Sequence, residues 1–257
     1  MSTEPFPSMT NPGYGRLLTA FALAAALLAG GLSAPAAAAG DERIPAFRAE
    51  YEVRYGRLTL GESRLELEYI GDDRYRYEMH VRPRGIARAV LRTDLTDISE
   101  GRVAGDGSLE PERFTHKRSG RSEREETVVF DAETTTIRFD DGETLDWEDG
   151  AVDRLLPQLL IMRDLAGTIE RRLTYRIADD GEISDYTFER KGRERVSVPA
   201  GSYRAERVQR VREGDSDRES NAWVYRRWSN LPVKIEHIDS GRTFVMELTE
   251  VSGPIRD

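Results

Sequence analysis

The feature that most constrains the fold of this chain is a strict alternation of apolar and charged residues in several short segments. Residues 46–55 place an aromatic or aliphatic side chain at every second position, and residues 74–82 repeat the pattern. Side chains of a strand point alternately to the two faces of a sheet, so a period of two indicates one buried and one solvated face. The sequence therefore predicts a mainly β fold, an antiparallel meander that forms a curved sheet or open barrel.

Further candidate strands follow at regular spacing, separated by turn signals such as Gly71-Asp72-Asp73. We expect a bulge or an edge position in residues 203–212, where the alternation is poor. The predicted strands after residue 90 are 93–100, 113–117, 126–131, 135–139, 171–178, 185–190, 195–198, 203–212, 222–228, 234–239 and 243–251.

One segment has the period of a helix instead. Between Val152 and Leu165 the apolar residues fall on one helical stripe, and Pro157 lies inside it. Proline is tolerated only in a first helical turn, so we expect an irregular turn followed by two to three turns of helix that end near Gly167. This predicts one short amphipathic helix, about residues 152–166, packed on or in the sheet. A less regular helical pattern covers residues 86–91.

The N-terminal residues have the three parts of a secretory signal. Arg16 precedes an apolar run over residues 17–32, and an alanine-rich stretch ends at Ala39. This layout predicts a signal peptide, residues 1–39, that is cleaved before Gly40, and a periplasmic mature chain that does not span the membrane. The alternative is a retained membrane anchor, although the run is shorter than the roughly 20 residues that a span needs. Residues 40–257 are expected to form a single domain.

Composition excludes several classes of protein and site. The chain has no cysteine, so a lipid-modified cysteine, a disulfide and a thiolate zinc site are all impossible. Removing residues 1–39 takes away one acid, Glu4, and one base, Arg16, so the formal charge stays at −9. A net acidic chain is poorly suited to bind the phosphates of a nucleic acid, and we expect no nucleic-acid partner.

No catalytic or metal-binding motif stands out. The three histidines, His80, His116 and His237, fall on different predicted strands without metal-ligand spacing. Gly214-Asp215-Ser216 resembles the start of an esterase block but lacks the leucine that should follow it, and a G-x-S-x-G motif is absent. We therefore expect no metal, no cofactor and no enzymatic activity.

The predicted buried faces are rich in tyrosine. Tyrosine combines an apolar ring with a hydroxyl that needs a partner, so its enrichment is typical of a roomy, amphipathic cavity. An ordinary core whose hydroxyls reach the barrel rim is the alternative. If the cavity exists, the predicted ligand-contact residues are Tyr51, Tyr55, Tyr75, Tyr77, Leu156 and Leu159.

Several stretches together resemble an exported bacterial family known as domain of unknown function 3108 (DUF3108). They are Phe47-x-Ala-x-Tyr-x-Val with Gly61, the run Asp106-Gly107-Ser108-Leu109 with Pro111, the residues Asp153, Leu155 and Leu159, and Val198-Pro199-Ala200-Gly201-Ser202-Tyr203 followed by Trp223 and Leu231-Pro232. The resemblance implies export, one β domain over residues 40–257 and no known catalytic residue. A looser fold-level likeness, through Trp223 and Leu231-Pro232, is to the periplasmic lipoprotein carriers of the LolA and LolB type.

Three hypotheses of function follow. The first is a non-enzymatic carrier or sensor that holds a lipid or a lipoprotein-like ligand in a half-barrel, with the predicted helix as a plug or lid. The second is an interaction or scaffold module with an envelope protein partner and no ligand. The third is a hydrolase whose site has no recognisable motif.

Overall fold

The structure, a computed structural model, describes residues 43–120, 123–148, 150–212 and 217–256. The predicted signal peptide, its cleavage site and the Gly214-Asp215-Ser216 segment lie outside these residues. Among the helices that are described, none has the length and apolar character needed to cross a membrane.

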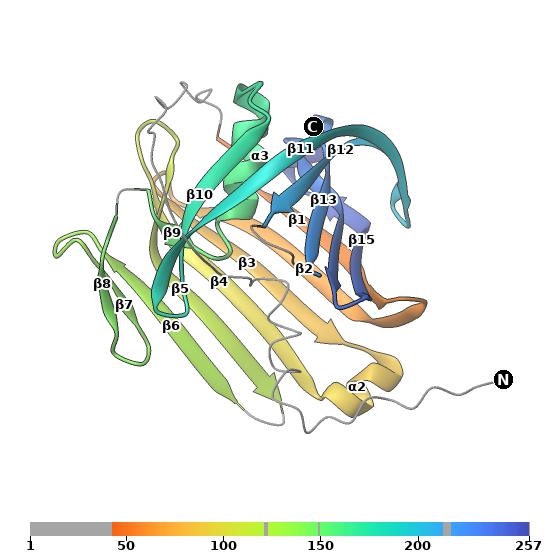
Figure 1. The fold of residues 1–257 in the computed structure, drawn as a ribbon, viewed down its shortest axis with the longest axis horizontal. Coiled ribbons are helices and arrows are strands. Elements are labelled where there is room, and N and C mark those ends of the chain that lie inside the picture. The colour runs from red at the N-terminus through yellow and green to blue at the C-terminus, as the bar shows by residue number, and fades with distance from the viewer. Residues whose placement is uncertain (1–42, 121–122, 149, 213–216, 257) are drawn as a thin grey trace.

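All described strands belong to one open sheet of 15 strands, which confirms the prediction of a mainly β fold with a curved, unclosed sheet (Figure 1). The first eight strands follow one another as an antiparallel meander, the N-terminal half-sheet. They are β1 (Phe47–Tyr55), β2 (Leu58–Ile70), β3 (Arg74–Pro83), β4 (Thr93–Val103), β5 (Leu109–Gly120), β6 (Arg124–Asp131), β7 (Thr136–Phe139) and β8 (Thr144–Asp146).

The remaining strands form the C-terminal half-sheet, which joins the first half where β15 pairs antiparallel with β1. Its far edge is β9, which pairs with β10 in parallel. The strands are β9 (Val152–Asp153), β10 (Arg172–Asp179), β11 (Glu182–Val198), β12 (Gly201–Val211), β13 (Glu219–Tyr225), β14 (Leu231–Asp239) and β15 (Arg242–Ser252).

The structure differs from the predicted strands in several places; for example, the predicted strand 222–228 ends at Tyr225, and residues 226–228 form a 3₁₀ turn. Residues 185–190 and 195–198 are one continuous strand, β11, whose register shifts between Arg190 and Gly192. The bulge expected in residues 203–212 therefore lies on the partner strand, and β12 is an interior strand. Alternation could not reveal β8 and β9, because three and two residues are too short to display a period.

Among the described residues, two α-helices and two short 3₁₀ turns accompany the strands. The helix α3 (Pro157–Gly167) has Pro157 in its first turn, as predicted, and follows an irregular turn. The helix α2 (Gly85–Leu91) follows β3 and contacts β2 and β3. The 3₁₀ turns are η1 (Arg226–Trp228) and η2 (Pro254–Arg256).

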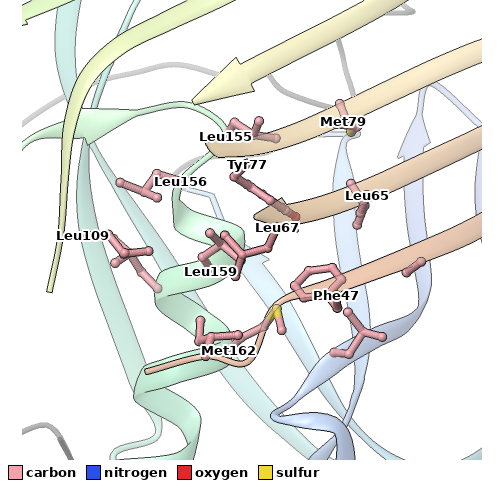
Figure 2. Close-up of a cluster of buried hydrophobic side chains, with 14 of the residues drawn as sticks. Phe47, Leu65, Leu67, Tyr77, Met79, Leu109, Leu155, Leu156, Leu159 and Met162 are labelled. Atoms are coloured by element: carbon pink, nitrogen blue, oxygen red, sulfur yellow. The ribbon is translucent and has the colours of Figure 1, made fainter. Parts of the chain in front are cut away.

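The helix α3 lies between the two half-sheets and is buried on two sides (Figure 1). Toward the N-terminal half-sheet, Leu159 and Met162 belong to the large core cluster and face Phe47 and Tyr77 (Figure 2). Ile161 instead packs in a smaller cluster with residues of β10, β12 and β13: Leu173, Val208 and Val224. The helix is thus a central element rather than one with a single apolar stripe and a solvated back.

Gly61 of β2 lies beside the register shift between β1 and β2 at Val53/Arg54, and it permits close packing of β2 against β3. A Cβ atom on Gly61 would collide with the carbonyl oxygen of Arg82 in β3. Any larger residue would have to push the two strands apart, which accounts for a glycine at this position.

Candidate functional site

Three tyrosines predicted to contact a ligand, Tyr51, Tyr75 and Tyr77, are buried core residues. Tyr51 donates a hydrogen bond of 2.8 Å to the carbonyl oxygen of Pro232, and Tyr77 donates one of 2.9 Å to Gln158 Oε1. The side chains of all three are at most 1% exposed, and burial raises the pKa of each hydroxyl. Tyr55, by contrast, is 37% exposed at the end of β1.

The third buried tyrosine belongs to a polar network that begins α3. Tyr75 and Ser99 hydroxyls are 3.0 Å apart, and Ser99 Oγ donates a 2.5 Å hydrogen bond to Asp153 Oδ2. The other oxygen, Asp153 Oδ1, accepts hydrogen bonds from the backbone amides of Leu155 and Leu156. Burial raises the pKa of Asp153 to about 6. The hydrogen bonds from Ser99, Leu155 and Leu156 and the positive charge of Arg154 oppose this shift.

Leu156 and Leu159 lie with these tyrosines in the large core cluster. Figure 2 shows Leu159 of α3 toward Tyr77 and Leu67, whereas Leu156, the residue before the helix, extends to the other side. The structure therefore brings Tyr51, Tyr75, Tyr77, Leu156 and Leu159 into one packed core and leaves Tyr55 at its margin. Their contact with a ligand stays a prediction, and the pocket described below is lined by other residues.

A buried cluster of charges joins β4, β5, β9 and β10. His116 Nδ1 is 2.5 Å from Asp97 Oδ1, and Arg154 Nη2 is 3.6 Å from the same oxygen. Arg154 Nη1 also donates a 3.2 Å hydrogen bond to Asp179 Oδ1. Two buried atoms of the cluster, Arg154 Nε and Asp179 Oδ2, have no hydrogen-bond partner among the described residues.

Burial and pairing oppose each other in this cluster. Burial disfavours the cation of Arg154, but Asp97 and Asp179 more than offset it and raise its pKa. Burial raises the pKa of Asp179 to about 6, and the charge of Arg154 limits the shift. The guanidinium also lies 4.8 Å from the centre of the Phe114 ring. The cluster stabilises the junction of the half-sheets only while all of its charges stay paired.

Neither Ser99 nor His116 is hydrogen-bonded as half of a serine–histidine pair; among the described residues such a contact joins Ser220 Oγ and His237 Nδ1, 3.0 Å apart. Ser99 Oγ bonds to Asp153 and Tyr75, whereas His116 Nε2 accepts a 3.4 Å contact from Arg118 Nε. A serine nucleophile is normally activated by a hydrogen bond to its general base. In the described part of the chain, no three histidine or carboxylate side chains are grouped as metal ligands either.

A pocket of about 140 Å³ lies on the other side of α3, against the C-terminal half-sheet. Pro157 and Ile161 contribute the helix side of its wall. Most of the remaining wall is apolar and comes from Ile177, Phe188, Val208, Ala222, Val224, Pro232 and Ile235.

The polar part of the wall is rich in arginine. Arg154, Arg210 and Arg212 all line the pocket. Arg210 lies 3.4 Å from the centre of the Tyr186 ring. Burial lowers the pKa of Arg210, as it disfavours a charged group that leaves water.

Arg212 is held by neutral groups. It donates to Ser220 Oγ at 3.3 Å and to the carbonyl oxygen of Arg218 at 3.4 Å, and no ion pair joins it to a carboxylate among the described residues. Burial, followed by repulsion from Arg210, lowers its pKa to about 10. Nearby His237, 3.0 Å from Ser220 Oγ through Nδ1, has its pKa lowered to about 4 by burial and by the charge of Arg212.

Sequence reasoning missed these residues, although some left a signal. Asp97 and Ser99 occupy positions of β4 that alternate with Leu95 on the buried face, where apolar residues are expected. Arg210 and Arg212 follow Val208 at the same spacing, so the poor alternation of this segment marked cations on the inner face. Arg154 interrupts an apolar run in the same way.

Comparisons with known proteins agree with the fold. The crystal structure of a β-barrel-like protein of domain of unknown function DUF1849 from Brucella abortus aligns with a TM-score of 0.54 and 11% identity, over 82% of this chain and 99% of that chain. This similarity supports the fold alone. A putative lipoprotein from Parabacteroides distasonis ATCC 8503 aligns over 84% of this chain and 100% of that chain at 9% identity, and its TM-score of 0.32 is too low to support an argument.

No curated protein matches the chain. The model of a family described as protein of unknown function, DUF3108, matches residues 50–249. This range covers most of the chain and every strand from β2 to β14, so the chain belongs to the DUF3108 family.

Proposed function

We propose that the protein is exported to the periplasm and binds an apolar or amphipathic envelope molecule there without catalysing a reaction. The observation that carries this proposal is the pocket between α3 and the C-terminal half-sheet. Export is supported by the signal-like arrangement of residues 16–39.

The composition of the pocket wall supports a ligand pocket rather than an accidental void in the core. Protein interiors are close-packed, and a void beside Ile161 and Val208 forfeits contacts that a larger side chain would supply. Ligand pockets combine an apolar lining with a few polar groups that orient the ligand. This pocket has both, because Arg154, Arg210 and Arg212 share a wall that is otherwise apolar.

The volume limits what can enter. An engineered apolar cavity of about 150 Å³ accommodates one benzene molecule. The pocket, at about 140 Å³, therefore fits a small apolar group or a segment of an alkyl chain. If the ligand has a longer alkyl chain, we expect its remaining carbons to lie outside this pocket.

Native mass spectrometry of protein purified without detergent tests the proposal, together with titration of a fluorescent fatty-acid probe. We expect a co-purifying amphiphile or saturable probe binding, and weaker binding by Ala222→Ile, which fills the pocket with a side chain that suits a strand. Arg102→Gln, an exposed change on β4, is the control. If no ligand co-purifies and the probe does not bind, the carrier hypothesis is wrong and the interaction module replaces it.

Export has its own test. N-terminal sequencing of the protein from a periplasmic fraction should find Gly40 or a residue close to it. A chain that begins at Met1, or that remains in the membrane fraction, would contradict export.

A further inference from the structure

We infer that the pocket beside α3 selects amphiphiles with an anionic head group, a carboxylate or a phosphate, which binds at Arg210 and Arg212 while the first carbons of the chain lie along Ile161 and Val208. This inference rests on the proposed function and specifies its ligand.

The geometry of β12 orders the pocket from apolar to cationic. Val208 and Arg210 alternate along β12, Arg212 follows at the same spacing directly after the strand ends, and all three line the pocket. Val208 packs in the cluster of Ile161 and Val224, at the apolar end. Arg212 lies at the other end, where it bonds to Ser220 of β13. An amphiphile has the same order along its length, from alkyl chain to head group.

The charges around the pocket leave an excess of positive charge at that end. Elsewhere in this half-sheet, Arg190 of β11 makes a bidentate pair with Glu206, through bonds of 2.7 and 2.9 Å. Among the described residues the acceptors of Arg212 are neutral, and Asp239, a carboxylate whose charge acts on Arg212, is paired at 3.4 Å with the exposed Arg218. Asp179, whose charge also acts on Arg210, pairs with Arg154 at 3.2 Å.

An anion would remove this imbalance. A charge held away from water is unfavourable unless it is paired and hydrogen-bonded, so Arg212 gains when a carboxylate or phosphate approaches it. A guanidinium can donate two parallel hydrogen bonds to two oxygens of a carboxylate or of a phosphate. Ser220 and the buried His237 add polar groups beside Arg212, with Ser220 Oγ 3.0 Å from His237 Nδ1. A cationic head group would meet repulsion there instead.

Four ten-carbon amphiphiles test the inference by displacement of a neutral fluorescent dye: decanoate, decyl phosphate, decanol and decyltrimethylammonium. We expect both anions to bind at least about tenfold more tightly than decanol, and the cation to bind most weakly. The ratio of decanoate to decyl phosphate then distinguishes a fatty-acid-like ligand from a phosphate-bearing one.

Variants identify the group responsible. Arg212→Gln should weaken decanoate binding about tenfold or more and leave decanol binding unchanged, whereas Arg212→Lys should retain most of the anion preference. Arg102→Gln, which removes the same charge from an exposed position, should bind as the natural protein does. Thermal unfolding of each variant confirms that it is folded.

Two failures have different meanings. Equal affinity for decanoate and decanol, or equal anion binding by Arg212→Gln and Arg102→Gln, overturns the inference but leaves a neutral-ligand pocket intact. If none of the four amphiphiles displaces the dye and the dye itself does not bind, the proposed function fails as well.

Discussion

The two half-sheets place arginine on opposite faces. In the N-terminal half-sheet, Arg64 and Arg76 lie on the outer face and share Glu78, with distances of 2.9 and 2.8 Å. In the C-terminal half-sheet, Arg210 and Arg212 lie on the inner face and line the pocket against α3. All four arginines are half-buried, but those of the N-terminal half-sheet pair with a carboxylate, whereas Arg210 and Arg212 share a pocket wall with apolar side chains.

The difference separates stability from function. Ion pairs on the outer face contribute little to the free energy of unfolding, about 0–1 kcal/mol each, because water solvates their charges. A cation on an inner face opposes folding unless it is paired, and the acceptors of Arg212 among the described residues are neutral, so its presence there calls for a use in the folded protein. The tyrosines of the N-terminal half-sheet, whose hydroxyls are satisfied, stabilise the core, whereas the arginines of the C-terminal half-sheet are better suited to bind a ligand.

The largest expected effect is on Arg154, which lies between the two half-sheets. Arg154→Leu removes the cation that Asp97 and Asp179 share, and should lower the free energy of unfolding by about 3–5 kcal/mol. Arg76→Leu, on the outer face, should cost no more than about 1 kcal/mol. Urea denaturation measures both, and equal losses would mean that the buried cluster is no more important than a surface pair.

The two sides of α3 provide the next comparison. Leu159 is completely buried in the large core cluster, so Leu159→Ala should lower the free energy of unfolding by about 2–5 kcal/mol. Ile161→Ala should cost less, because one side of Ile161 already borders the pocket, and should weaken probe binding. The comparison fails if chemical denaturation finds a loss below about 0.5 kcal/mol for Leu159→Ala, since the helix would then not pack on the core.

A third effect depends on pH. The pKa of Asp153 is about 6 in the folded chain against 3.8 as the ordinary value, so its proton stabilises the fold, and that stabilisation is lost as pH rises through this range. Asp153→Asn keeps an oxygen for the amides of Leu155 and Leu156 without a charge. It should raise the free energy of unfolding by about 1–3 kcal/mol at pH 7.5 and by a smaller amount, about 1 kcal/mol or less, at pH 4.5.

Denaturation at the two pH values, beside the exposed control Asp72→Asn, checks this effect. The control should stay within about 0.5 kcal/mol of the natural protein at both. A loss of stability in Asp153→Asn at pH 7.5 would show that the ionised carboxylate is preferred at the start of α3.

The sequence predicted the fold well because a regular strand repeats its signal. Alternation located β1 and β3 almost to the residue, and Pro157 marked the first turn of α3. The sequence did not indicate that α3 would be buried on two sides, because charged residues such as Arg163 and Asp164 are typical of the solvated face of a surface helix. Their partial burial depends on how the C-terminal half-sheet curls around the helix.

The candidate site was less predictable, because it depends on contacts between distant segments. Tyr77 reaches Gln158, and Arg154 reaches Asp97, across separations that no local pattern records. Tyrosine enrichment predicted a roomy cavity, but a sequence does not say whether a hydroxyl has found a partner inside a packed core. Arg210 in β12 and Arg212 just after it were visible only as a failure of alternation, which is equally typical of a bulge.

The smallest expected effect separates the two uses of tyrosine. Tyr77→Phe removes one hydrogen bond, to Gln158, from a fully buried side chain and should lower the free energy of unfolding by about 1 kcal/mol. Tyr55→Phe, at the exposed end of β1, should change it by less than about 0.5 kcal/mol. Neither should alter the affinity for the fatty-acid probe, because neither tyrosine lines the pocket. If Tyr77→Phe weakens probe binding by more than its loss of stability explains, the ligand reaches the N-terminal half-sheet, and the tyrosine site predicted from the sequence would replace the arginine pocket.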